Sequence, residues 1–198
     1  MKIVCFPDFG CGGVLCASLN HEKVSMTSEG YMPSSSHDAL KIGPSVAEFD
    51  SKQWDIAVKK RENMHQQWLG THVHPRYIID LEYIERIIYI HVVSLESRCF
   101  IAARQCQSEQ EWKPTCIDHC LRDRYPDGSL WTTILRHDKI IGIDLYHLVH
   151  TPSYRQMIFK VNDILYDEEL WIKWYKFNDY RDDMAIALDA YNNINMHR

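Results

Sequence analysis

Apolar residues along this chain fall into two patterns, short continuous runs and stripes at helical spacing. The continuous runs are rich in isoleucine, valine and aromatic residues, which is typical of strands buried on both faces of a parallel sheet. They predict strands at residues 2–6, 67–73, 86–93 and 139–145. Because parallel strands need crossover connections, which are usually helices, the sequence predicts an α/β fold with a central, mainly parallel sheet flanked by helices.

The helically spaced stripes predict the helices that flank this sheet. One begins at Gly12, and the others are expected at residues 51–64, 94–106, 153–165 and 167–191. Ser51, Ser94 and Ser153 are the predicted caps of three of them, because a serine hydroxyl accepts a hydrogen bond from a backbone N–H of the first turn. The polar, turn-rich residues 21–50 are expected to form a long connection with no core element.

Composition narrows the class of protein. The 198 residues suit one domain, and 45% hydrophobic with 25% charged residues is typical of a soluble globular protein. No apolar run approaches the ~20 residues that cross a bilayer, and Pro7 and Asp8 interrupt any signal-peptide core. Seven irregularly spaced cysteines suggest free thiols in a reducing cytoplasm. A net charge of −5 with scattered signs argues against nucleic-acid binding but leaves room for a local anion pocket.

The first twenty residues contain the best candidate for that pocket. A strand, a sharp turn at residues 7–10 and a helix follow one another, and Gly10, Cys11, Gly12 and Gly13 would form a nest of backbone N–H groups. Such a nest at a helix N-terminus binds phosphate or sulfate. The structural alternative is a tight turn that binds nothing. The turn lacks the Lys-Ser/Thr ending of a Walker A loop, which disfavours an ordinary ATPase.

Three blocks of sequence resemble the sulfotransferase family, whose members share the P-loop nucleotide-binding fold. They are Phe6-Pro7-x-x-Gly10 after the first strand, Gly70-Thr71-His72-Val73-His74-Pro75 at the end of the second, and Arg86-Ile-Ile-Tyr89-Ile before a helix. Their order matches the family's Tyr-Pro-Lys-Ser-Gly-Thr-Thr, Lys-Thr-His-Leu-Pro and Ile-Tyr-Val-x-Arg motifs. The C-terminal Trp171-x-x-Trp174-Tyr-x-x-Asn178 is similar to the tails of small virus-encoded relatives. The resemblance covers about half of the chain and implies one three-layer P-loop-type domain over residues 1–198.

The resemblance also implies an activity and a donor. Sulfotransferases move a sulfuryl group from 3′-phosphoadenosine-5′-phosphosulfate to a hydroxyl or amine on a small-molecule or glycan acceptor. The family histidine aligns with His72, which would take the acceptor's proton, as suits a side chain that titrates near neutral pH. His74 is the second candidate, because one extra residue precedes Pro75, and strand alternation would put both rings on one face. A structural, hydrogen-bonded histidine is the alternative at either position.

The chain departs from the family where positive charge is needed. Asp8 and Gly70 stand where the family has lysines, and Val92 aligns with the arginine that holds the donor's 3′-phosphate. Arg98 and Arg104, on the helix after the third strand, could replace these charges, since guanidinium groups bind phosphate bidentately. Their structural alternative is an ordinary solvated helix face.

Other functions are therefore also compatible with the sequence. One is a P-loop-fold binding or interaction protein without a donor site, and another is a small nucleotide kinase, disfavoured by the missing P-loop lysine. Cys116, His119 and Cys120 could begin a zinc site if Cys106 or His137 approached, although packed thiols are the simpler interpretation. A metal-dependent phosphotransferase would use Asp8 with Asp38 or Glu48.

Overall fold

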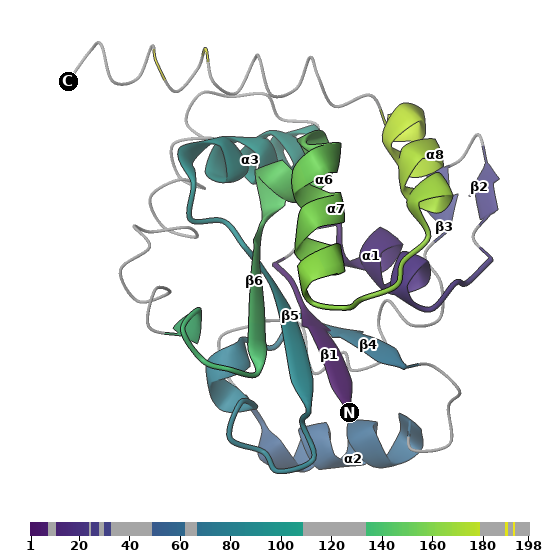
Figure 1. Ribbon diagram of the computed structural model, residues 1–198. Helices are drawn as coiled ribbons and strands as arrows, with labels where there is room; N and C mark the ends of the chain where they lie inside the picture. The colour runs from purple at the N-terminus through teal and green to yellow at the C-terminus, as the bar shows by residue number, and fades with distance from the viewer. Residues whose placement is uncertain are drawn as a thin grey trace.

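The computed structural model describes residues 1–7, 11–23, 25–27, 30–32, 49–61, 67–108 and 134–178, together with residues 189 and 192. Its centre is a sheet of four parallel strands in the order β4-β1-β5-β6 (Figure 1). The strands are β1 (Lys2–Cys5), β4 (Trp68–Thr71), β5 (Arg86–His91) and β6 (Ile140–Asp144). The predicted α/β class and the predicted strands are confirmed, including the parallel pairing of β1 with β5.

The strands pair as their apolar runs require. Val4 of β1 lies opposite Gly70 of β4 on one side and Ile88 of β5 on the other. The central strands are almost entirely buried, because helices cover both faces of the sheet and leave no solvent-facing side. This is why their sequences read as continuous apolar runs and show no alternation with polar residues.

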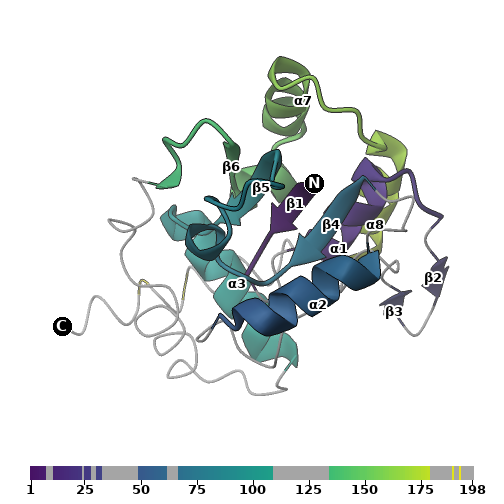
Figure 2. The same cartoon turned by 90° about the horizontal axis from the view of Figure 1, so that it is seen from below.

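Two hydrophobic clusters lie on the two faces of the sheet. One contains Val4 and Ile88 and is covered by α1 (Gly12–Leu19), α6 (Leu145–His150), α7 (Pro152–Val161) and α8 (Glu168–Asn178). The other contains Ile3 and Ile87 and is covered by α2 (Ser51–Arg61). Figure 2 shows α2 and α7 on opposite sides of the sheet. The three layers fit the predicted architecture.

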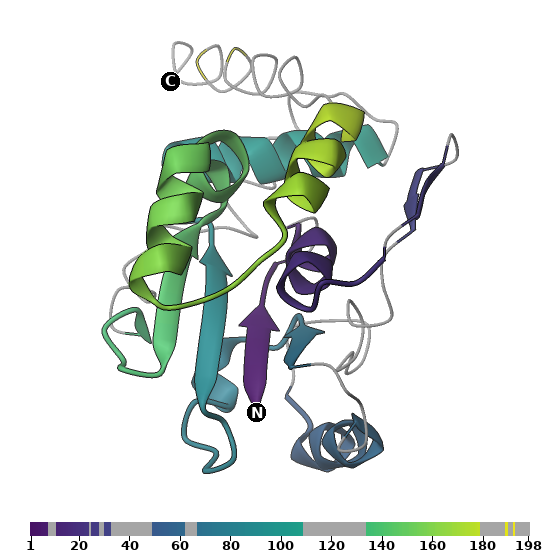
Figure 3. The same cartoon turned by 45° about the vertical axis from the view of Figure 1, so that its right-hand side comes forward.

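Helix α3 (Leu95–Ser108) follows β5. It lies beyond the carboxyl ends of the strands, which the arrowheads of β1 and β5 mark (Figures 1 and 3). Its predicted cap is confirmed, because Ser94 Oγ accepts the Ser97 backbone N–H at 3.1 Å. No helix in the described ranges is long and apolar enough to cross a membrane.

Several predicted boundaries were wrong. Asp50, and not Ser51, caps α2, since its Oδ1 accepts the N–H groups of Lys52 (2.9 Å) and Gln53 (3.3 Å). The predicted strand at 139–145 ends at Asp144, which caps the short helix α6 that the sequence did not reveal. The predicted helix at 153–165 is α7, which begins at Pro152 and ends at Val161.

The segment predicted to be one long connection contains a small hairpin. Strands β2 (Ser25–Thr27) and β3 (Gly30–Met32) pair antiparallel, with Ser25 opposite Met32. Each strand has only three residues, too few for a clear period-two pattern to show in the sequence. Residues 33–48 of the predicted connection lie outside the described residues, as does the end of the predicted C-terminal helix after residue 178, apart from 189 and 192.

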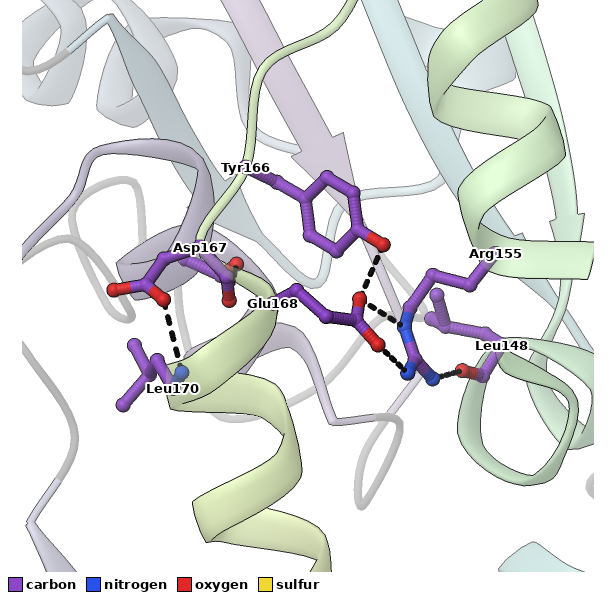
Figure 4. Close-up of polar contacts among 7 residues, drawn as sticks. Leu148, Arg155, Tyr166, Asp167, Glu168 and Leu170 are labelled. Atoms are coloured by element: carbon purple, nitrogen blue, oxygen red, sulfur yellow. Dashed lines mark hydrogen bonds and ion pairs between the residues drawn. The ribbon is translucent and has the colours of Figure 1, made fainter. Parts of the chain in front are cut away.

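A buried ion pair joins α7 to α8 (Figure 4). Arg155 is 2% exposed, and its guanidinium donates to both carboxylate oxygens of Glu168, at 3.2 and 2.6 Å, and to the Leu148 backbone oxygen at 2.7 Å. Tyr166 donates to the same carboxylate, and the guanidinium lies over the Trp171 ring. Because these partners satisfy the buried guanidinium, the cluster joins α8 to α7 and α6.

Candidate functional site

The carboxyl edge of the sheet is where this topology places a ligand site. The chain passes from β1 to β4 on one side, and then from β4 to β5 on the other side of β1. The strand order therefore reverses between β1 and β5, and open α/β sheets bind ligands in the crevice at such a point. The residues that follow β1 and β5, namely the glycine-rich turn and the start of α3, border this point.

The glycine-rich turn is described from Cys11 onward, and Gly10 lies outside the described residues. Cys11 adopts the left-handed conformation, with φ 61° and ψ 15°, immediately before α1. A β-carbon on Gly12 would lie only 2.2 Å from the Phe6 ring, so the ring packs directly on the Gly12 backbone. Gly12 is therefore required by packing, while the conformation of Cys11 turns the chain into the helix. Gly13 is buried in the first turn of α1.

The thiols near this turn are part of the core. Cys5 and Cys16 are 1% and 0% exposed, and Cys99 on α3 is 0% exposed. Burial raises the pKa of the Cys5 and Cys16 thiols; the neighbouring Cys16 thiol raises the pKa of Cys5 further, and Glu22 raises that of Cys16 further. Such thiols are poor nucleophiles and pack as small apolar side chains, as the sequence predicted.

His72 lies beside the end of β1. Its Nδ1 is 3.1 Å from the Phe6 backbone oxygen, and the Phe6 and His72 rings meet edge to face with centroids 4.5 Å apart. A carbonyl oxygen can only accept, so Nδ1 carries the hydrogen and the neutral ring has its lone pair on Nε2. That tautomer has the chemistry of a proton acceptor.

His74 is in a different environment. Its Nδ1 accepts the Arg76 backbone N–H at 3.2 Å, so the neutral ring carries its hydrogen on Nε2. Burial, with a smaller contribution from the Arg76 charge, lowers the pKa of His74 to about 4. Both features oppose a role as general base near neutral pH.

The two histidines do not share a face. Because β4 ends at Thr71, strand alternation does not continue through His74. The His72 ring packs on Phe6, which belongs to the cluster under α1, whereas the His74 ring packs on Tyr89, in the cluster under α2. The prediction that both rings lie on one face was wrong.

Arg98 and Arg104 lie on α3 as predicted. The Arg98 side chain is partly buried, and its Nε is a buried atom without a hydrogen-bond partner in the described part of the chain. The backbone of Arg104 is helical, but its side chain lies outside the described set. Arg98 is therefore the one of these two arginines whose side chain the structure describes.

A cluster around Asp144 was missed by sequence reasoning. Asp144 is a buried residue, and its carboxylate accepts the Ser97 hydroxyl (2.6 Å) and the backbone N–H groups of Ser94 (3.4 Å) and His147 (3.3 Å). His91 lies opposite it in the register of β5 and β6. The available signal was a polar residue within each apolar run, His91 in residues 86–93 and Asp144 in residues 139–145, since the ends of parallel strands meet at one edge.

No group of three or more potential metal ligands occurs among the residues that the structure describes. The predicted zinc candidates Cys116, His119 and Cys120 lie outside those residues, as do Asp8, Asp38 and Glu48. The Cys106 side chain is not described either. His137 Nδ1 lies 2.9 Å from Asp138 Oδ1, next to it in the chain.

Comparisons with models of protein families, with curated proteins and with solved structures found no match to this chain. The resemblance to sulfotransferases therefore rests on the three sequence blocks, which include Phe6 directly after β1, the end of β4 and most of β5.

Proposed function

We propose that this chain is a divergent sulfotransferase-like transferase. It would move a sulfuryl group from 3′-phosphoadenosine-5′-phosphosulfate to a hydroxyl or amine of a small-molecule or glycan acceptor. The donor's phosphosulfate would lie at the turn formed by Gly10, Cys11, Gly12 and Gly13, at the point where the strand order reverses. Sequence blocks in the family's order support this assignment.

The hydrogen bond from His72 Nδ1 to the Phe6 backbone oxygen is the observation that carries the proposal. It orients the imidazole beside the strand that leads into the turn, and it leaves the Nε2 lone pair as the basic atom. Backbone oxygens fix histidine tautomers in this way in many sites where the other nitrogen reacts or binds.

In the proposed reaction, the proton of the acceptor O–H moves to His72 Nε2 while the acceptor oxygen forms a bond to sulfur. The bond from sulfur to the phosphate oxygen breaks, and its electron pair remains on adenosine 3′,5′-bisphosphate. The charge that develops on this leaving group requires positive partners. Arg98 and Arg104 are the proposed partners, in place of the lysines that the turn and β4 lack.

The proposed setting is the cytoplasm, including that of a virus-infected host. The buried free thiols Cys5, Cys16 and Cys99 support a reducing compartment. The scattered charge of the chain supports a small-molecule or glycan acceptor over a nucleic acid.

A second candidate is a binding or interaction protein that keeps the fold without the donor site. The observation that favours it is the Phe6 ring packed on Gly12, at the start of the helix that would receive the donor. Asp8, Gly70 and Val92 at the family's charged positions point the same way. A nucleotide kinase remains the least favoured, because no P-loop lysine is present.

Transfer from a ³⁵S-labelled donor to phenolic and glycan acceptors tests the proposal. The informative variant is His72→Asn, whose amide can still donate to the Phe6 oxygen but cannot accept a proton at the position of Nε2. We expect transfer by the parent protein and a loss of about 10²–10⁴-fold in the variant. Equal transfer by both proteins would refute the role of His72, and no transfer by the parent across the acceptors would favour the binding protein.

A further inference from the structure

The strands β5 and β6 end in a histidine and an aspartate that face each other. His91 and Asp144 are register partners, with Nδ1 of the histidine 3.8 Å from Oδ2 of the aspartate. Their side chains are only 13% and 10% exposed. The separation is too long for a hydrogen bond, and within the described residues the buried Nδ1 has no hydrogen-bond partner. The His91 ring therefore faces the Asp144 carboxylate without a hydrogen bond to it.

The carboxylate is held from the other side by two helices. Ser97 Oγ and the backbone N–H of His147 donate to Oδ1, and the backbone N–H of Ser94 donates to Oδ2. These donors lie at the N-termini of α3 and α6, where a negative charge is stabilised. Asp144 is thus a fixed negative group beside the His91 ring, and because Nδ1 is buried, the exposed 13% of the side chain belongs to its other atoms.

The surroundings of His91 favour the neutral form of its ring. Burial lowers the pKa of its imidazole, and the negative charge of Asp144 opposes that effect without cancelling it. Other titratable groups on the packed elements include Tyr89 on β5, with its ring centroid 6.2 Å away, Glu96, Arg98 and Cys99 on α3, Tyr146, His147 and His150 on α6, and Tyr154 on α7, which interacts electrostatically with Asp144. An additional negative charge at the exposed edge of the ring would raise the pKa of His91 toward and above its ordinary value.

His91 lies where a positive charge would help to bind an anion. Cys5, the last residue of β1, pairs with Tyr89, so His91 lies two residues farther along β5, beyond the end of β1 where the chain leads into the glycine-rich turn. This is the strand pair between which the order reverses, and the turn itself supplies no lysine. A positive group at this position would offset the charge of a bound phosphate or sulfate.

We propose that His91 is the cationic anion-binding residue of this edge, and that it takes up a proton from solvent when a phosphate- or sulfate-bearing ligand binds. The imidazolium then donates Nδ1–H to Asp144 and Nε2–H to the ligand. This inference rests on the proposed function, because it assumes that the anionic donor occupies the carboxyl edge. The proposal gives a role to His91, a residue that the sulfotransferase resemblance does not identify. Asp144 is then the residue that positions the His91 ring.

Proton uptake on binding tests the proposal. Adenosine 3′,5′-bisphosphate is titrated calorimetrically into the full chain at pH 7 in two buffers that differ in ionisation enthalpy. We expect binding by the parent protein with net proton uptake. We expect His91→Gln to lose the uptake and to weaken binding by about 10- to 100-fold, as befits a lost charge-assisted hydrogen bond. His147→Gln, which removes an exposed histidine of the same edge, should retain the uptake.

A second measurement on the parent protein avoids any effect of the variant on folding. Side-chain ¹H–¹⁵N spectra should show the His91 ring neutral without ligand and doubly protonated at saturation with adenosine 3′,5′-bisphosphate at pH 7. Binding with no proton uptake, or with a ring that stays neutral, overturns this inference and leaves the proposed donor site intact. Absence of binding overturns both.

Discussion

The imidazole Nδ1 of His72 donates to the backbone oxygen of Phe6 across 3.1 Å, and the backbone N–H of Phe6 donates to the Thr71 oxygen at the same distance. Both backbone groups of Phe6 are therefore bonded to the end of β4. This arrangement fixes where β1 ends and which nitrogen of His72 is basic. It also gives His72 a structural role beside the proposed chemical one, so the two roles must be separated by the choice of substitution.

Two substitutions of His72 should differ in stability. His72→Ala removes a hydrogen bond and the ring packed on Phe6, and we expect it to lower the free energy of unfolding by about 1–2 kcal/mol. His72→Asn retains an amide donor for the Phe6 oxygen and should lose less than about half of that. Urea denaturation of both variants measures the difference. Equal losses would mean that the hydrogen bond to Phe6 does not contribute.

Gly12 should tolerate no side chain while the Phe6 ring is in place. The added β-carbon of Gly12→Ala would lie 2.2 Å from that ring, and such overpacking costs about 1–3 kcal/mol of unfolding free energy. In a Phe6→Ala background the same change should cost much less, because the obstructing ring is gone. A double-mutant cycle by chemical denaturation measures this coupling, and additive effects would contradict the close packing.

The ion pair between Arg155 and Glu168 should be a main contribution to the packing of α8. Glu168→Ala leaves a guanidinium that is 2% exposed without its carboxylate, and we expect it to lower the unfolding free energy by about 3 kcal/mol. The matched control is Glu169→Ala, which removes an exposed carboxylate from the same helical turn and should change stability by less than about 0.5 kcal/mol. Similar losses in both variants would show that only the charge at the helix N-terminus matters.

The stability of the fold should fall on acidification below about pH 6.5. Burial lowers the pKa of His150 to about 4, and burial together with Arg76 does the same for His74. Between about pH 4 and 6.5 the unfolded chain binds protons at these histidines and the folded chain does not, so the free energy of unfolding rises with pH across that window.

Unfolding curves at several pH values check this dependence. His150→Gln should flatten the slope between pH 4 and 6.5, because one buried titrating group is removed, whereas His147→Gln, at an exposed position, should leave it unchanged. A slope that is the same in the parent protein and both variants would contradict the assignment to His150.

The strands and their parallel arrangement were predictable because their signal is local. Runs such as that of β5, Arg86–His91, are continuous in the sequence, and helices follow β1 and β5 directly. The cap of α2 was misassigned to Ser51 because Asp50 and Ser51 are both good caps, and only backbone geometry decides which side chain reaches the first turn. Helix α6 was missed because its six residues continue the apolar run of β6.

Only part of the candidate site could be predicted from the sequence, for a different reason. His72 and the glycine-rich turn are recognisable as motifs, because each is contiguous in the chain. The pairing of His91 with Asp144 depends on the register of two strands separated by residues 92–139. No local pattern encodes that register, although a polar residue interrupts the apolar run at each of these two positions.

The most direct test of a donor site at this edge is a thermal-shift titration of the parent protein with adenosine 3′,5′-bisphosphate, with ATP as the control. At 100 times its dissociation constant a ligand stabilises the folded state by about 2.7 kcal/mol, which raises the melting midpoint by several degrees. We predict that adenosine 3′,5′-bisphosphate raises the midpoint more than ATP does. No shift with either nucleotide at millimolar concentration, or a larger shift with ATP, would contradict the proposed sulfotransferase-like donor site.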